Sequence, residues 1–209
     1  MGALYQLLDY VVSTVFTIYI GLVWMRFLLQ LVGADFYNPY SQFVVKATTP
    51  LLHPLRRIVP SAAGMDTAAL LLILLLKLVE TGLQSYLEAG AAMPPVALLL
   101  TSIFALAGNL ISFYLVAIIL SVIASWLAPP GYTPASLLLQ QVVEPAMAPL
   151  RRLLPSAGGL DFSPMIAMLL LQIAGYFLKL AIITAAPLLQ GWAMYTLLAS
   201  RPLLGYLGS

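Results

Sequence analysis

The chain has 209 residues, of which 62% are hydrophobic and only 8% are charged. A typical soluble domain carries about 25% charged residues, so sixteen charges cannot cover a water-soluble surface of this size. The composition therefore predicts a polytopic membrane protein and argues against soluble enzyme folds. The absence of cysteine excludes disulfides and thiolate metal sites. A net charge of +2 gives no indication of nucleic-acid binding.

Four segments are long and apolar enough to cross a hydrocarbon core of about 30 Å, which takes roughly 20 helical residues. They cover approximately residues 10–32, 67–87, 97–127 and 163–186. We expect helices, because a helix satisfies its backbone hydrogen bonds within one segment. The first ten residues contain no Lys or Arg, so we interpret the first segment as a retained helix and not as a cleavable signal.

Two shorter stretches, about 40–58 and 134–153, lie between these spans. Each is apolar, contains two prolines and ends in an Arg-Arg pair. The prolines are Pro50, Pro54, Pro145 and Pro149. This pattern predicts a proline-broken helix that lies in the membrane interface. A re-entrant loop is the alternative, although its freed backbone groups would need cover from the rest of the protein.

The chain contains a tandem repeat. Residues 50–66 read PLLHPLRRIVPSAAGMD, residues 145–161 read PAMAPLRRLLPSAGGLD, and ten positions are identical at a shift of 95. Two spans in each unit give both units the same orientation, so the repeat is parallel, about an axis along the membrane normal. Six spans in inverted repeats are the alternative. We assign residues 1–95 to repeat one, 96–187 to repeat two and 188–209 to an interfacial C-terminal tail.

The same turn follows the arginines in both repeats. A proline, which lacks an amide donor, stops the interfacial helix, and a glycine allows a positive φ angle. An aspartate then provides a cap for the next helix. These predicted structural positions are Pro60, Gly64 and Asp66 in repeat one and Pro155, Gly159 and Asp161 in repeat two.

The distribution of Lys and Arg predicts the orientation in the membrane. Lys46 and the two arginine pairs lie in the loops after the first and third spans, whereas the connector 88–96 holds only Glu88. Basic residues favour the cytoplasmic side of a membrane. We therefore expect both Arg-Arg loops to be cytoplasmic and the protein to be a multi-pass protein of a bacterial inner membrane.

The repeated P-L-R-R-x-x-P-S-x-x-G-x-D motif, followed in repeat two by Phe162-Ser163-Pro164, resembles the YggT family of bacterial membrane proteins. Repeat one departs from this pattern, because Thr67-Ala68-Ala69 stand at the corresponding place. The resemblance covers about residues 10–187 and implies the two-unit form of the family. It also implies a role in membrane organisation, cell division or osmotic stress, and no set of catalytic residues.

The two arginine pairs are the first candidate site. Arg56, Arg57, Arg151 and Arg152 would form a basic surface that binds anionic phospholipids or an acidic segment of a partner. Each basic residue near an anionic membrane surface contributes about 1 kcal/mol. The alternative is that these arginines only fix the orientation of the protein in the membrane.

Polar residues inside the spans are the second candidate site. Lys77, Glu80 and Gln84 form a polar stripe at helical spacing, and the repeat shift places Gln172 and Lys179 at corresponding positions. Charges at this depth normally face the interior of a bundle. We expect Glu80 to pair with Lys77 or with Lys179. A path for an ion or small solute and a docking surface for a partner helix are the alternatives.

No constellation of a nucleophile with a base, and no pair of intramembrane aspartates, is present in the sequence. His53 is the single histidine, so we expect no metal and no cofactor. The sequence thus predicts an all-α, non-enzymatic membrane protein that acts as a scaffold or assembly factor. Its expected partners are anionic phospholipids and a membrane protein or a second copy of the chain. A small ion or solute pathway is the alternative function.

Overall fold

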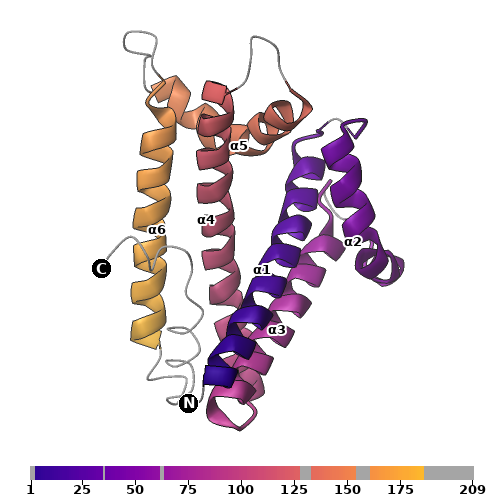
Figure 1. Cartoon of the computed structure of the whole chain (residues 1–209), viewed down its shortest axis with the longest axis vertical. Coiled ribbons are helices and arrows are strands. Elements are labelled where there is room, and N and C mark those ends of the chain that lie inside the picture. The colour runs from indigo at the N-terminus through magenta and orange to yellow at the C-terminus, as the bar shows by residue number, and fades with distance from the viewer. Residues whose placement is uncertain (1–2, 35, 62–63, 128–132, 154–160, 186–209) are drawn as a thin grey trace.

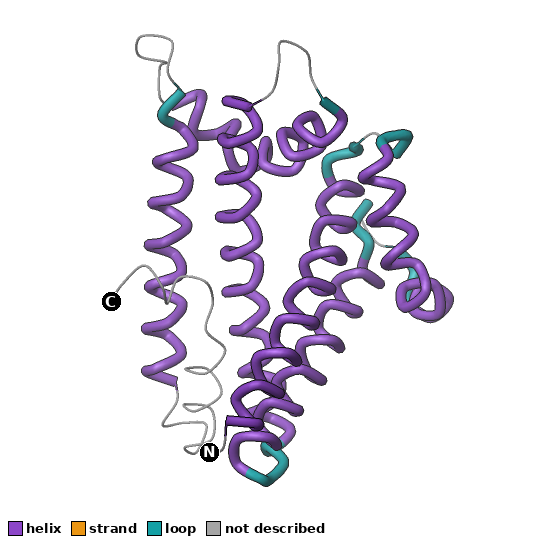
Figure 2. The backbone as a smooth tube through the Cα atoms, in the orientation of Figure 1, coloured by secondary structure: helices purple, strands orange, loops and turns teal. Residues whose placement is uncertain are grey.

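The computed structural model describes residues 3–34, 36–61, 64–127, 133–153 and 161–185, and these residues form six helices (Figures 1 and 2). The helices are α1 (Ala3–Leu31), α2 (Pro39–Ile58), α3 (Thr67–Ala89), α4 (Pro95–Leu127), α5 (Pro134–Leu153) and α6 (Ser163–Ala185). Four of them, α1, α3, α4 and α6, are long and apolar enough to cross a membrane. The predicted all-α membrane fold with four spans is confirmed.

The helix bounds lie close to the predicted segments except at the start of α1. This helix begins at Ala3, about two turns before the expected position, because residues 3–10 contain neither proline nor glycine. Asp9 therefore belongs to the membrane-spanning helix. The predicted interfacial tail, residues 188–209, lies outside the described residues.

The helices form two similar halves. Helix α1 packs mainly against α3, helix α4 packs against α6, and the contact between α3 and α4 joins the halves. Helices α2 and α5 lie at the same end of the four spans, whereas the short connection from α3 to α4 lies at the opposite end (Figure 1). Both repeats therefore have the same orientation, as the parallel arrangement requires.

Helices α2 and α5 continue through their prolines, so the prediction that the prolines break them is not confirmed. Pro50 and Pro54 are four residues apart, which places both missing N–H donors on one face of α2. Both prolines are exposed, so the carbonyl groups that they leave unpaired lie on the outer face of the helix. Pro145 and Pro149 are exposed in α5 in the same way.

Helix α2 has two faces of different character. Its buried residues recur at the spacing of one helical face and are Ser41, Val44, Thr48 and Leu52. Its exposed residues include large apolar and basic side chains, among them Tyr40, Phe43, Lys46, Leu51 and Ile58. A helix that presents both kinds of side chain outside the bundle is suited to the membrane interface.

Candidate functional site: two arginine–aspartate turns and a polar bundle interior

The first arginine of each pair contacts the aspartate that lies just before the next helix. In repeat one, Nη2 of Arg56 donates a hydrogen bond to Oδ2 of Asp66. In repeat two, Nε of Arg151 donates to Oδ2 of Asp161 over 3.0 Å. The same chemistry thus joins the end of the interfacial helix to the start of the following span in both halves.

The second oxygen of each aspartate accepts a backbone hydrogen bond at the start of the span. Oδ1 of Asp66 accepts from the backbone N–H of Ala69 over 3.2 Å, which makes Asp66 the N-cap of α3. Oδ1 of Asp161 accepts from the N–H of Ser163 over 2.9 Å. Each carboxylate therefore satisfies a free helix donor and neutralises an arginine at once.

The turn between Pro60 and Asp66 has the predicted features in repeat one. Helix α2 ends at Ile58, and Pro60 follows two residues later, after the C-cap Val59. Gly64 has a φ of 77°, and the hydroxyl of Thr67 donates to the carbonyl oxygen of Pro60 over 2.6 Å. Their counterparts in repeat two, Pro155 and Gly159, lie outside the described residues.

The second arginine of each pair is left available. Arg57 and Arg152 are exposed, and neither has a hydrogen bond or an ion pair to any described residue. Because their neighbours Arg56 and Arg151 are engaged with aspartates, the four arginines do not form one uniform basic surface. Within the arginine pairs, the available charge therefore lies at one position in each repeat, in the last turn of α2 and of α5.

Repeat two carries an additional carboxylate beside the first arginine of its pair. Nη1 of Arg151 donates to Oε2 of Glu144 over 2.6 Å. Partial burial acts to lower the pKa of Arg151, but the hydrogen bonds to Asp161 and Glu144 outweigh it and raise that pKa. Burial acts to raise the pKa of Asp161, but hydrogen bonds from Ser163 and Arg151 outweigh it and hold that pKa below its ordinary value.

A buried arginine that the sequence did not single out joins α1 to α2. Nη1 of Arg26 donates to the carbonyl oxygen of Val45 over 3.0 Å and to the hydroxyls of Thr48, over 2.8 Å, and Thr49, over 3.1 Å. About two turns earlier in α1, the hydroxyl of Tyr19 donates to the carbonyl oxygen of Ala47 over 3.2 Å. Side chains of α1 therefore bind the backbone of α2 immediately before its first proline.

Lys77 and Glu80 form an ion pair inside the bundle. The distance from Nζ of Lys77 to Oε2 of Glu80 is 2.9 Å, and the two residues are 4% and 2% exposed. Both residues belong to α3, so this ion pair forms within one helix and does not require a contact with another helix. Of the two partners that the sequence allows for Glu80, the structure places Lys77 in contact.

Further polar groups on three helices lie in the same part of the bundle. Thr81, Gln84 and Ser85 of α3 are buried, as are Thr101 and Ser102 of α4. Asp9 of α1 lies close enough to Glu80 and to Glu88 of α3 for their charges to interact. We call these residues, together with Lys77, the interior polar cluster. The cluster occupies the half of the bundle nearest to the connection between α3 and α4.

The structure does not bring the polar residues of α6 to this cluster. Gln172 and Lys179 are exposed on the outer surface of α6, and α6 packs against α4 and α5. The same helical face is buried in both spans, because buried Ala167 and Gly175 of α6 correspond to buried Leu72 and Glu80 of α3. Helix α3 packs against α1, α2 and α4, however, whereas α6 packs mainly against α4 and α5. The positions of Gln172 and Lys179 are therefore left uncovered, which the repeat shift alone does not predict.

Comparison with known proteins identifies the family. The sequence model named CCB3/YggT matches residues 4–87 and again residues 100–183. The uncharacterized protein PA0392 of Pseudomonas aeruginosa is 44% identical over 184 residues, which cover 85% of this chain and 92% of that protein. The uncharacterized protein YggT of Escherichia coli K12 is 37% identical over 172 residues, or 79% of this chain and 86% of that protein.

A protein of Vibrio alginolyticus, described as an uncharacterized protein in the proC 3' region, is 36% identical over 175 residues. These residues cover 82% of this chain and 92% of that protein. No solved structure matches the chain significantly. The two matches to the family model coincide with the two structural halves, each with an interfacial helix between two spans. The chain is therefore a two-repeat member of the CCB3/YggT family of membrane proteins.

Proposed function

We propose that this protein is a non-enzymatic scaffold of a bacterial inner membrane. The last turns of α2 and α5, with the exposed Arg57 and Arg152, form what we call the basic end, and this end binds the headgroups of anionic phospholipids. The observation that carries the proposal is the difference in contacts between the two arginines of each pair. Arg56 and Arg151 hold the turns together, whereas Arg57 and Arg152 are exposed and have no partner among the described residues. An exposed guanidinium with five N–H donors is suited to a phosphate group.

The surroundings of the exposed arginines support a membrane surface as the binding partner. Ile58 and Leu153 follow Arg57 and Arg152 directly in the chain, and their exposed fractions are 78% and 76%. Large apolar side chains beside basic ones favour insertion at the level of the headgroups. Two arginines at about 1 kcal/mol each contribute about 2 kcal/mol, which favours anionic over zwitterionic lipid by roughly thirtyfold.

In this proposal the basic end faces the cytoplasm, because basic loops are retained on that side of the membrane. The family resemblance supports a contribution to membrane organisation, cell division or osmotic stress. A bound layer of anionic lipid would then serve as a platform for a membrane-protein partner or a second copy of the chain.

The proposal is tested by the lipids that remain bound after purification. The double variant Arg57→Gln/Arg152→Gln is compared with Lys46→Gln, which removes an exposed charge elsewhere on α2. Both proteins are extracted from vesicles of equal parts phosphatidylglycerol and phosphatidylcholine, and the retained lipids are quantified by mass spectrometry. We expect the double variant to lose most of the preference for phosphatidylglycerol and Lys46→Gln to retain most of it. Equal retention in wild type and double variant would contradict the proposal.

A pathway for a small ion or solute is the second candidate function, and the interior polar cluster favours it. Buried hydroxyl oxygens of Ser85, Thr101 and Ser102 have no hydrogen-bond partner among the described residues. Because Gln172 and Lys179 face outward, such a path would run between α1, α3 and α4 and not between α3 and α6. Cation flux into vesicles that contain the wild-type protein, abolished by Glu80→Gln without loss of stability, would favour this function over a scaffold.

A further inference from the structure

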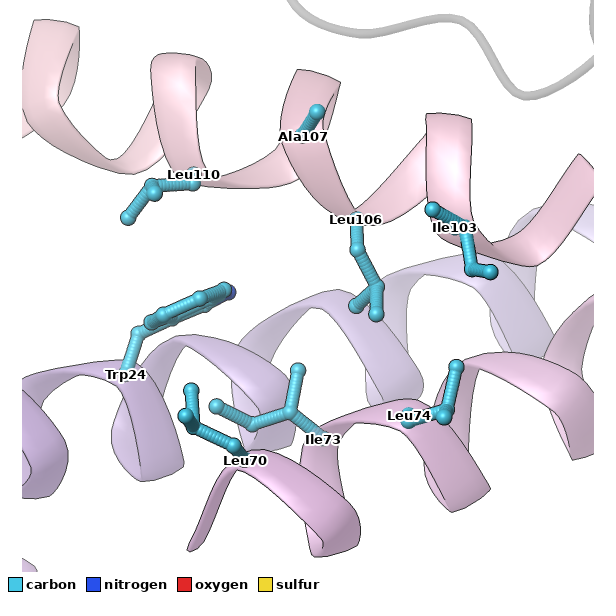
Figure 3. A pocket seen from close by; sticks show the side chains of 8 residues that line it. All are labelled: Trp24, Leu70, Ile73, Leu74, Ile103, Leu106, Ala107 and Leu110. Atoms are coloured by element: carbon cyan, nitrogen blue, oxygen red, sulfur yellow. The ribbon is translucent and has the colours of Figure 1, made fainter. Parts of the chain in front are cut away.

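A cavity of about 240 Å³ lies between the two repeats, outside the basic end and the interior polar cluster (Figure 3). Three spanning helices line it with apolar side chains, which include Trp24 of α1, Ile73 and Leu74 of α3, and Leu106, Ala107 and Leu110 of α4. Ala107 is also exposed at the surface of the bundle. The cavity therefore opens toward the lipid that surrounds the spans.

One polar group faces this apolar space. The indole of Trp24 is 93% buried, and its Nε1 has no hydrogen-bond partner among the described residues. In Figure 3 the ring nitrogen lies at the edge of the indole that faces the other labelled side chains. A buried N–H group without an acceptor is unfavourable, so the cavity is expected to hold an acceptor.

The nature of the cavity restricts what that acceptor can be. A water molecule requires two to four polar partners, and the indole N–H would give it one. An occupant with an apolar body and a single carbonyl oxygen satisfies the N–H and fills the remaining space. The ester-linked acyl chain of a phospholipid has such an apolar body and such a carbonyl oxygen. Phospholipids also form the surroundings toward which the cavity opens.

The depth of Trp24 agrees with an ester carbonyl. The spanning part of α1 has 28 residues, or about 42 Å, so when it is centred on a 30 Å hydrocarbon core it extends about 6 Å beyond each side. Trp24 lies about 10 Å before the end of α1 and therefore about 5 Å inside the hydrocarbon boundary. Ester groups lie at this boundary, and a modest displacement of one lipid brings its carbonyl oxygen to the indole.

We propose that the cavity between the repeats binds one acyl chain of a phospholipid, whose ester carbonyl oxygen accepts a hydrogen bond from Nε1 of Trp24. This site depends on the chain and its ester and not on the charge of the headgroup. It is therefore independent of the basic end, and either proposal can fail without the other.

The first test measures whether a chain enters the cavity. In a background of Trp126→Phe and Trp192→Phe, Trp24 is the only fluorophore of its kind, and its emission is recorded in vesicles of phosphatidylcholine with brominated acyl chains. We expect quenching by bromine, and relief of that quenching when Ala107→Phe fills the cavity. Ala181→Phe, on the exposed surface of α6, is the matched control and should leave the quenching unchanged.

The second test isolates the hydrogen bond. The protein is extracted from vesicles of equal parts ester-linked and ether-linked phosphatidylcholine, and the two retained lipids are quantified. We expect the wild type to retain the ester lipid about fivefold more, the ratio that one hydrogen bond of ordinary strength sustains. Trp24→Phe keeps the apolar ring, removes the N–H and should abolish the preference. Equal quenching in Ala107→Phe and Ala181→Phe, or equal retention of the two lipids by the wild type, would overturn the proposal.

Discussion

Removal of Lys77 by the variant Lys77→Met tests how the ion pair supports the bundle. Both partners are nearly inaccessible, at 4% and 2%, and their charged atoms are 2.9 Å apart. Removal of one member of a buried pair typically costs about 3–5 kcal/mol, because the other charge is left without compensation. We expect about 3 kcal/mol, the lower end of that range, because Glu80 can escape part of the cost by taking up a proton.

A double-mutant cycle assigns this energy to the pair. Lys77→Met, Glu80→Gln and their combination are compared by thermal unfolding in detergent, followed by circular dichroism. The combined variant should be less destabilised than the sum of the single variants by more than about 1 kcal/mol, since it leaves no unpaired charge. The matched control is Lys179→Met, which removes an exposed lysine of α6.

The control separates the two partners that the sequence allows for Glu80. Because Lys179 is exposed on α6 and does not face the pair, the effects of Lys179→Met and Glu80→Gln should add within about 0.5 kcal/mol. Coupling between Glu80 and Lys179, together with additivity between Glu80 and Lys77, would refute the arrangement described for this pair.

Four other predictions concern the two ends of the bundle. Arg26→Met should lower the free energy of unfolding by about 2 kcal/mol, because the acceptors of α2 lose a charged donor, and thermal unfolding measures this loss. In the same assay Asp66→Ala should cost more than Asp161→Ala, because Asp66 is almost completely buried and Asp161 is 45% exposed.

The lowered pKa of Asp161 should stabilise the protein above about pH 3.9, the ordinary Asp value, and this contribution should be lost as the pH falls through the lowered pKa. Asp161→Asn should therefore weaken the pH dependence of acid unfolding in that range. Single cysteines at Ser61 and Ala91 should label from the cytoplasmic and the external side respectively, and labelling of both from one side would exclude the proposed orientation.

The sequence was sufficient to predict the architecture, because its signals are local or repeated. Apolar segments of spanning length predicted four helices, and the two copies of one motif predicted parallel halves. The Lys77–Glu80 pair could also be predicted from the sequence, since residues three apart share a helical face. The continuity of α2 through Pro50 was not predictable in this way, because the prolines are tolerated on the exposed face of the helix, and that face is determined by the packing of α2 against α1 and α3.

The contacts of the arginines depend on tertiary structure. The pairing of Arg56 with Asp66 and of Arg151 with Asp161 requires a turn that brings residues ten positions apart together. The one signal in the sequence was that both residues recur at the same spacing in both repeats. Arg26 gave no such signal, because its repeat equivalent is Ser121 and its acceptors belong to a different helix.

The two repeats share the arginine–aspartate contact before their second span but not their interiors, and this difference has a physical basis. Each interfacial helix must reverse into a span, so each turn needs a capping carboxylate and a cation to balance it, as Asp66 and Asp161 show. The membrane-spanning parts of the helices have no such shared requirement for a carboxylate and a cation. Repeat one joins its helices through Arg26 and carries the Lys77–Glu80 pair, whereas α6 has few buried residues and presents mainly apolar side chains to its surroundings. Polar contacts fix helices in one arrangement more strictly than apolar packing in lipid does, so repeat one is the half that holds a fixed geometry against which α4 packs, and α6 in turn packs against α4.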